Sequence, residues 1–148
     1  MKDERLSGLG EGSVRDGAGN VWVMAGIAIG YGIVGNDVAD FAELAKRGVQ
    51  ASDSLKNALW LNGRFGRTAA DFYMIYEYSS EEFGGSKGIA AALGLSVSSQ
   101  KRLTQSANNL SPLEGGRHVQ QEVPAAMSLD EQQKYVADLL RRWIATYR

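Results

Sequence analysis

Glycine is unevenly distributed along this chain, and its distribution limits where long helices can form. Half of the 18 glycines lie within the first 35 of 148 residues. A glycine inside a helix costs about 1 kcal/mol relative to alanine. We therefore expect a flexible, glycine-rich arm over residues 1–20 and a single domain over residues 21–148, because the remainder is too short to divide into two good cores.

The segment 21–34 reads VWVMAGIAIGYGIV and carries no charge. A membrane-spanning helix needs about 20 apolar residues, so we expect no membrane span. Larger side chains alternate with smaller ones from Ile27 to Ile33, which slightly favours a short β segment. Gly26 and Gly30 have a spacing that would instead let two helices approach closely. With either structure, segment 21–34 is predicted to mediate self-association.

The charges nearly balance, with 16 Lys and Arg against 17 Asp and Glu, so any electrostatic recognition has to be local. The absence of cysteine excludes disulfide, zinc–thiolate and iron–sulfur sites. The single histidine, His118, excludes a metal site with two imidazoles. We expect neither a metal nor a cofactor. The start of the chain lacks the pattern of a secretory signal, and we expect a cytoplasmic protein.

Helix signals recur from residue 36 onwards and predict a mainly α-helical, compact bundle of five or six helices. An apolar stripe over 37–47 begins near Asn36 or Asp37 and is expected to stop at Gly48. A shorter helix is predicted over 52–61.

Two capping-box patterns predict the start of further helices. Thr68 with Asp71 is the first, so the aromatic run over 72–76 is interpreted as a helix face rather than a strand. Ser128 with Glu131 is the second, and apolar residues recur after it at helical spacing to the end of the chain.

Gly30, Gly32 and Gly35 form a G-x-G-x-x-G pattern that locally resembles a dinucleotide-binding fingerprint. That fold requires a second apolar strand after the following helix. The residues after Gly48 are polar and typical of a helix start instead, so we prefer a glycine-rich turn that leads into a helix.

The segment 87–105 resembles a helix-turn-helix. Ala90 stands where the two helices would touch, Gly94 at a left-handed turn, Leu95 beneath it and Ser96 at the cap of the second helix. Gln100 departs from the family pattern, which has a buried aliphatic residue there, so either the second helix is rotated or the match is accidental.

This resemblance implies DNA binding through the second helix. Its outward face would carry Val97, Ser98, Lys101, Arg102 and Gln105. Arg102 would read guanine and Gln105 adenine, while Lys87 and Lys101 would contact phosphates. Arg117 adds to a local surplus of positive charge. A lone reader with so little charge binds weakly, so we expect an oligomer. The acidic residues of segment 71–82 would repel DNA if they lay on the same side.

The chain leaves other interpretations open. The helical hairpin over 87–105 is also typical of plain packing, as in a protein-interaction subunit without enzymatic activity. Arg117 and His118 lie in a glycine-rich loop and would suit an RNA-cleaving site, with His118 as acid or base. This loop resembles the helical toxin-ribonuclease domains of prokaryotic conflict systems, in which several residues separate the arginine from the histidine.

Four other arginines are interpreted as structural. Arg64 and Arg67 would either add to a basic patch or extend over the core. Arg141 and Arg142 favour the dipole at the end of the last predicted helix and are typical of a solvated face.

Overall fold

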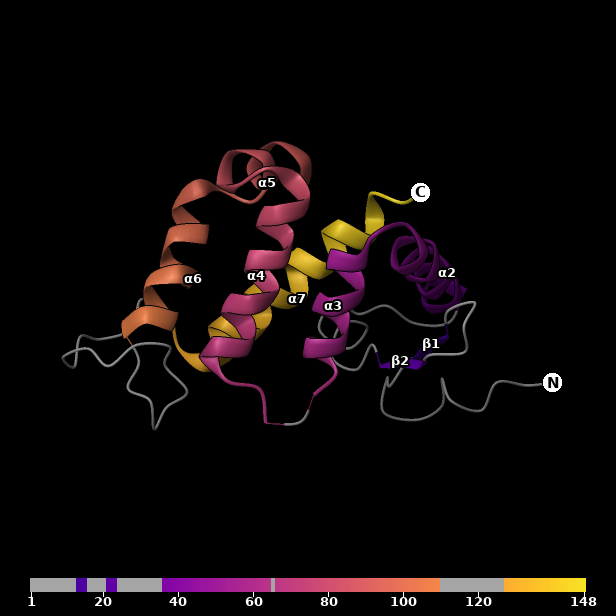
Figure 1. Cartoon of the computed structure of the whole chain (residues 1–148), viewed down its shortest axis with the longest axis horizontal. Helices are drawn as coiled ribbons and strands as arrows, with labels where there is room; N and C mark the ends of the chain where they lie inside the picture. The colour runs from indigo at the N-terminus through magenta and orange to yellow at the C-terminus, as the bar shows by residue number, and fades with distance from the viewer. Residues whose placement is uncertain (1–12, 16–20, 24–35, 65, 110–126) are drawn as a thin grey trace.

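The computed structural model describes residues 13–15, 21–23, 36–64, 66–109 and 127–148, and this part of the chain is mainly α-helical (Figure 1). Its helices are α2 (Asn36–Ala51), α3 (Asp53–Asn62), α4 (Ala69–Phe83), α5 (Ser86–Leu93), α6 (Val97–Asn109) and α7 (Leu129–Ala145). Two short strands, β1 (Ser13–Arg15) and β2 (Val21–Val23), pair in antiparallel fashion. The predicted compact bundle is confirmed.

Helix α7 supplies much of the hydrophobic core. Its buried apolar residues are Val136, Leu139, Leu140, Trp143 and Ile144. Figure 1 shows α7 passing behind α3 and α4, and it also packs against α2 and α5. The ring of Trp143 meets that of Phe83 edge-on, with centroids 5.5 Å apart. The last helix of the bundle therefore holds the earlier helices together.

Both predicted capping boxes are present. At α4, the Thr68 hydroxyl accepts from the Asp71 backbone N–H, and the Asp71 carboxylate accepts from the Thr68 backbone N–H. The same reciprocal pair joins Ser128 and Glu131 at α7. Each pair satisfies two backbone donors that a helix start leaves without intrahelical partners. The aromatic run is helical as expected, with Phe72 buried on its inner side.

The expected helix stop at Gly48 is wrong, since α2 continues to Ala51. Gly48 is buried, and a Cβ there would lie 2.5 Å from Leu55 Cδ2 and 2.9 Å from Tyr147 Cδ2. The missing side chain of Gly48 lets Leu55 and Tyr147 approach α2 closely, and the glycine does not change the direction of the backbone. Because the residues after Gly48 are helical, they do not provide the second strand of a dinucleotide-binding fold.

Strand β2 forms the first three residues of the apolar segment 21–34, and β1 lies within the predicted arm. The rest of segment 21–34, including its glycine pattern, lies outside the described residues. Within the described part of the chain, no helix combines the length and apolar character needed to cross a membrane.

Gly88 provides a test of the packing between α4 and α5. A Cβ at this position would overlap the carbonyl oxygen of Phe83, at the end of α4. We expect Gly88→Ala to lower the free energy of unfolding by about 3 kcal/mol, because the overlap forces a backbone shift. Urea denaturation measures the change.

Gly84→Ala is the control, because Gly84 has a φ of 76° and open space around its missing side chain. Alanine there should lower the free energy of unfolding by only about 1 kcal/mol, which is the cost of the left-handed backbone conformation for a residue with a Cβ. Equal losses in the two variants would contradict the proposed close contact at Gly88.

Candidate functional site

Helices α5 and α6 meet at a sharp bend, and residues 86–109 are called here the α5–α6 corner. Gly94 ends α5 in the left-handed conformation, with φ 68° and ψ 21°, and its N–H donates to the carbonyl of Ala90. Leu95 is buried beneath the turn. The Ser96 hydroxyl accepts from the Ser99 backbone N–H at 3.1 Å and so caps α6. Gly94, Leu95 and Ser96 occupy the positions predicted for them.

Gln100 lies inside the corner and is only 1% exposed. Its Nε2 donates to the carbonyls of Ser86, at 2.9 Å, and Leu95, at 3.0 Å. Its Oε1 accepts from the Tyr76 hydroxyl of α4 at 3.1 Å. Burial raises the pKa of Tyr76 above its ordinary value, so that hydroxyl remains a donor over a wider pH range. An amide with three hydrogen bonds therefore replaces the aliphatic residue that the family pattern has at this position.

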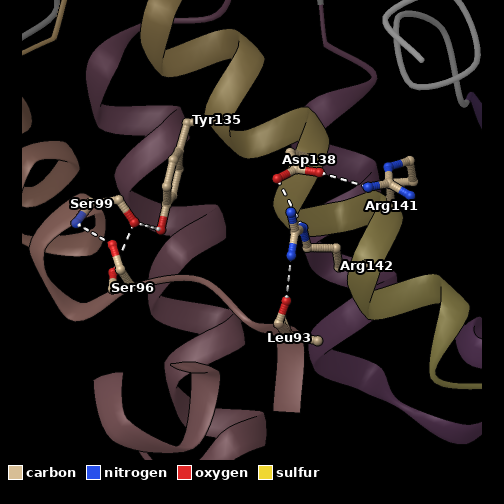
Figure 2. A network of polar contacts seen from close by, with 7 residues as sticks. All are labelled: Leu93, Ser96, Ser99, Tyr135, Asp138, Arg141 and Arg142. Atoms are coloured by element: carbon tan, nitrogen blue, oxygen red, sulfur yellow. Dashed lines mark hydrogen bonds and ion pairs between the residues drawn. The ribbon is translucent and has the colours of Figure 1, made fainter. Parts of the chain in front are cut away.

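Helix α7 fixes the other side of the bend (Figure 2). Arg142 Nη1 donates to the Leu93 carbonyl, and Arg142 Nε donates to Asp138, both at 2.9 Å. Arg141 contacts the second oxygen of Asp138 at 2.9 Å. The guanidinium of Arg142 turns to the end of α5, where a cation also compensates the helix dipole, and its side chain remains 38% exposed.

A second contact in Figure 2 joins α6 to α7. The Ser99 hydroxyl donates to the Ser96 carbonyl at 2.8 Å and lies 3.5 Å from the Tyr135 hydroxyl. Burial raises the pKa of Tyr135 above its ordinary value, so its hydroxyl stays neutral over a wider pH range. The start of α6 is thus anchored to the same helix that holds the end of α5.

These contacts determine which side of α6 faces solvent. The predicted contact residues on α6 are all exposed, and they are Val97, Ser98, Lys101, Arg102 and Gln105. The side chains of Gln100, Leu103 and Ala107 form the buried side. Lys87 is exposed on α5. Arg117 and His118 lie outside the described residues.

Arg102 is paired with an acidic residue that the sequence reasoning did not connect to it. Its Nη2 lies 3.9 Å from Glu131 Oε1, and both side chains are about half exposed, at 54% and 55%. The Ser128 backbone N–H, which donates to Glu131, holds the pKa of that carboxyl below its ordinary value, and Arg102 lowers it further. The only local signal was the Ser128–Glu131 capping box, which does not identify a partner on α6.

The arginines between α3 and α4 extend over neighbouring side chains. Arg67 lies over the Phe72 ring and donates to the Asn62 side chain at 2.8 Å. Arg64 lies over the Trp60 ring, 5.4 Å from its centroid, and pairs with Asp71 at 3.4 Å. Their described contacts are therefore made within the α3–α4 hairpin.

Acidic residues of segment 71–82 are engaged in contacts within the protein. Asp71 caps α4, and Glu82 accepts from the Ser52 hydroxyl at 3.1 Å and from the Tyr147 hydroxyl at 3.3 Å. Glu77 and Glu81 line a small pocket on α4. No cluster of three or more potential metal-ligating side chains occurs among the residues described.

Gln100→Leu tests whether the buried amide fixes the corner. Leucine matches the aliphatic family pattern, but it would leave the Tyr76 hydroxyl and the Leu95 carbonyl without this partner. We expect the free energy of unfolding to fall by about 1–3 kcal/mol. Gln105→Leu, an exposed change on the same helix, should stay within about 0.5 kcal/mol. A Gln100→Leu protein as stable as the wild type in urea would refute this role.

Searches against protein-family models, curated proteins and solved structures found no match. What the chain does must therefore be inferred from its own residues.

Proposed function

We propose that the protein binds duplex DNA through the α5–α6 corner, with the exposed face of α6 in the major groove. The observation that carries the proposal is the division of α6 into two sides. Its inner side is held by the hydrogen bonds of Gln100, while its outer side carries exposed polar and basic side chains. A helix presented in this way suits reading from the major groove.

The side chains on the outer face of α6 suit complementary tasks. Arg102 has the paired donors that recognise guanine, and Gln105 has the amide that recognises adenine. Ser98 would bond either a base edge or a phosphate, and Val97, 49% exposed, offers apolar surface to a thymine methyl group. Lys101 would contact a phosphate.

The remaining predicted contacts are cations that flank α6 in the sequence. Lys87 is assigned to the DNA backbone because it is exposed on the helix that precedes the bend. Arg117 remains a predicted backbone contact. Neutralising only about three phosphates gives weak binding that salt readily abolishes. We therefore propose that two or more copies act together on adjacent half-sites.

A protein-interaction role is the second candidate, and exposed apolar side chains on the α3–α4 hairpin favour it. Trp60 is 55% exposed and Met74 is 41% exposed, and both residue types are enriched in interfaces. The self-association predicted for segment 21–34 and the RNA cleavage predicted for Arg117 and His118 depend mainly on residues outside those described.

Arg102→Ala tests the DNA proposal. We expect about 10-fold weaker binding to the preferred duplex and a relaxed preference at one base pair, because a paired contact to guanine is lost. Selection from a random duplex pool identifies the preferred sequence, and fluorescence anisotropy measures the affinity. Lys101→Ala should instead weaken binding to all duplexes alike and reduce the salt slope by about one.

Arg47→Ala is the matched control, because Arg47 is also an exposed arginine that pairs with a glutamate, but on α2. Arg47→Ala should change the affinity for the preferred duplex only slightly. The proposal fails if the wild-type protein shows no salt-sensitive binding to duplex DNA, or if Arg47→Ala and Arg102→Ala weaken binding equally.

A further inference from the structure

Glu131 has a carboxylate that its own helix holds in place. One oxygen, Oε2, accepts from the Ser128 backbone N–H at 2.8 Å, while the Ser128 hydroxyl accepts from the Glu131 backbone N–H at 3.2 Å. The other oxygen, Oε1, is the one that lies 3.9 Å from Arg102. Glu131 is therefore an oriented charge beside α6 rather than a freely rotating surface side chain.

Buried contacts hold the start of α7 against α6. The Met127 backbone N–H donates to the Ser106 hydroxyl at 2.7 Å, and that hydroxyl donates to the Arg102 carbonyl at 2.7 Å. Gln132 Nε2 donates to the Met127 carbonyl at 3.1 Å. Because Met127, Ser106 and Gln132 are buried, packing holds the start of α7 close to the backbone of Arg102.

The neighbouring acid, Asp130, is engaged differently. It pairs with Lys134 of the next helical turn at 2.7 Å. Its charge is thus compensated within α7, whereas the charge of Glu131 is directed at α6. Of these two acids, Glu131 is therefore the one whose charge acts on a ligand bound by Arg102.

A phosphate that approaches Arg102 also approaches the Glu131 carboxylate, so attraction to the arginine and repulsion from the glutamate oppose each other. A guanine edge is uncharged and offers two acceptors, so the same carboxylate opposes it less. Specificity is a difference between affinities, and it rises when the competing contact is penalised.

We propose that Glu131, on α7, is a specificity-determining residue beside the α5–α6 corner. Its carboxylate restrains Arg102 and disfavours contacts of this arginine with the DNA backbone. This inference depends on the proposed function, because it assigns Glu131 a role in selecting among duplexes. Glu131 lowers the affinity for duplexes of arbitrary sequence more than the affinity for the preferred one.

Glu131→Gln tests this role, because glutamine also serves at the third position of a capping box and so preserves the start of α7. We expect about fivefold tighter binding to random-sequence duplex at low salt, a smaller gain on the preferred duplex and a steeper salt dependence. Fluorescence anisotropy across a salt series measures all three. An unchanged melting temperature would show that the variant remains folded.

Glu43→Gln is the matched control, since Glu43 forms an exposed pair with Arg47 on α2 at 4.0 Å. Glu43→Gln removes the same charge at a site away from the corner. It should leave unchanged the ratio of the affinity for the preferred duplex to the affinity for random-sequence duplex. If the wild type binds duplex DNA but Glu131→Gln does not lower that ratio, the role of Glu131 is overturned and the proposed function stands. If neither protein binds any duplex in a salt-sensitive way, both proposals fail together.

Discussion

The corner between α5 and α6 depends on the buried amide of Gln100. A buried amide without partners is costly, so its hydrogen bonds fix the relative positions of the groups that satisfy it. Here those groups are the Tyr76 hydroxyl of α4, the Ser86 carbonyl at the start of α5 and the Leu95 carbonyl in the turn. These three hydrogen bonds therefore fix the rotation of α6 about its own axis. That rotation determines which side chains of α6 face solvent.

The elements that could be predicted from the sequence are those whose partners are close in the chain. Thr68 and Ser128 each find their capping partner three residues later, and Gly94 satisfies a local need for a left-handed turn. The exposed face of α6 could be predicted for a similar reason. Once the bend at Gly94 is located, spacings of four and three residues assign Ser98, Arg102 and Gln105 to the same side of the helix.

The features that sequence reasoning missed depend on partners far along the chain. The sequence predicts a helix stop at Gly48, whereas the structure packs this glycine closely against Leu55 and against Tyr147, at the other end of the chain. Arg142 donates to the carbonyl of Leu93, 49 residues earlier, and nothing in the sequence indicates this partner. Local spacing cannot predict the contact of Gly48 with Tyr147 or that of Arg142 with Leu93. The pair between Arg102 and Glu131 has the same origin, because it exists only once α7 packs beside α6.

The bond from Arg142 to the Leu93 carbonyl means that the corner is not an autonomous module. A synthetic peptide covering residues 86–109 would contain the glycine turn and the serine cap, but neither Arg142 nor Tyr76. Water would then hydrate Leu93 and Gln100, and the two short helices would lose the scaffold that orients them. Transplanting these residues into another protein would therefore transfer their composition without their arrangement.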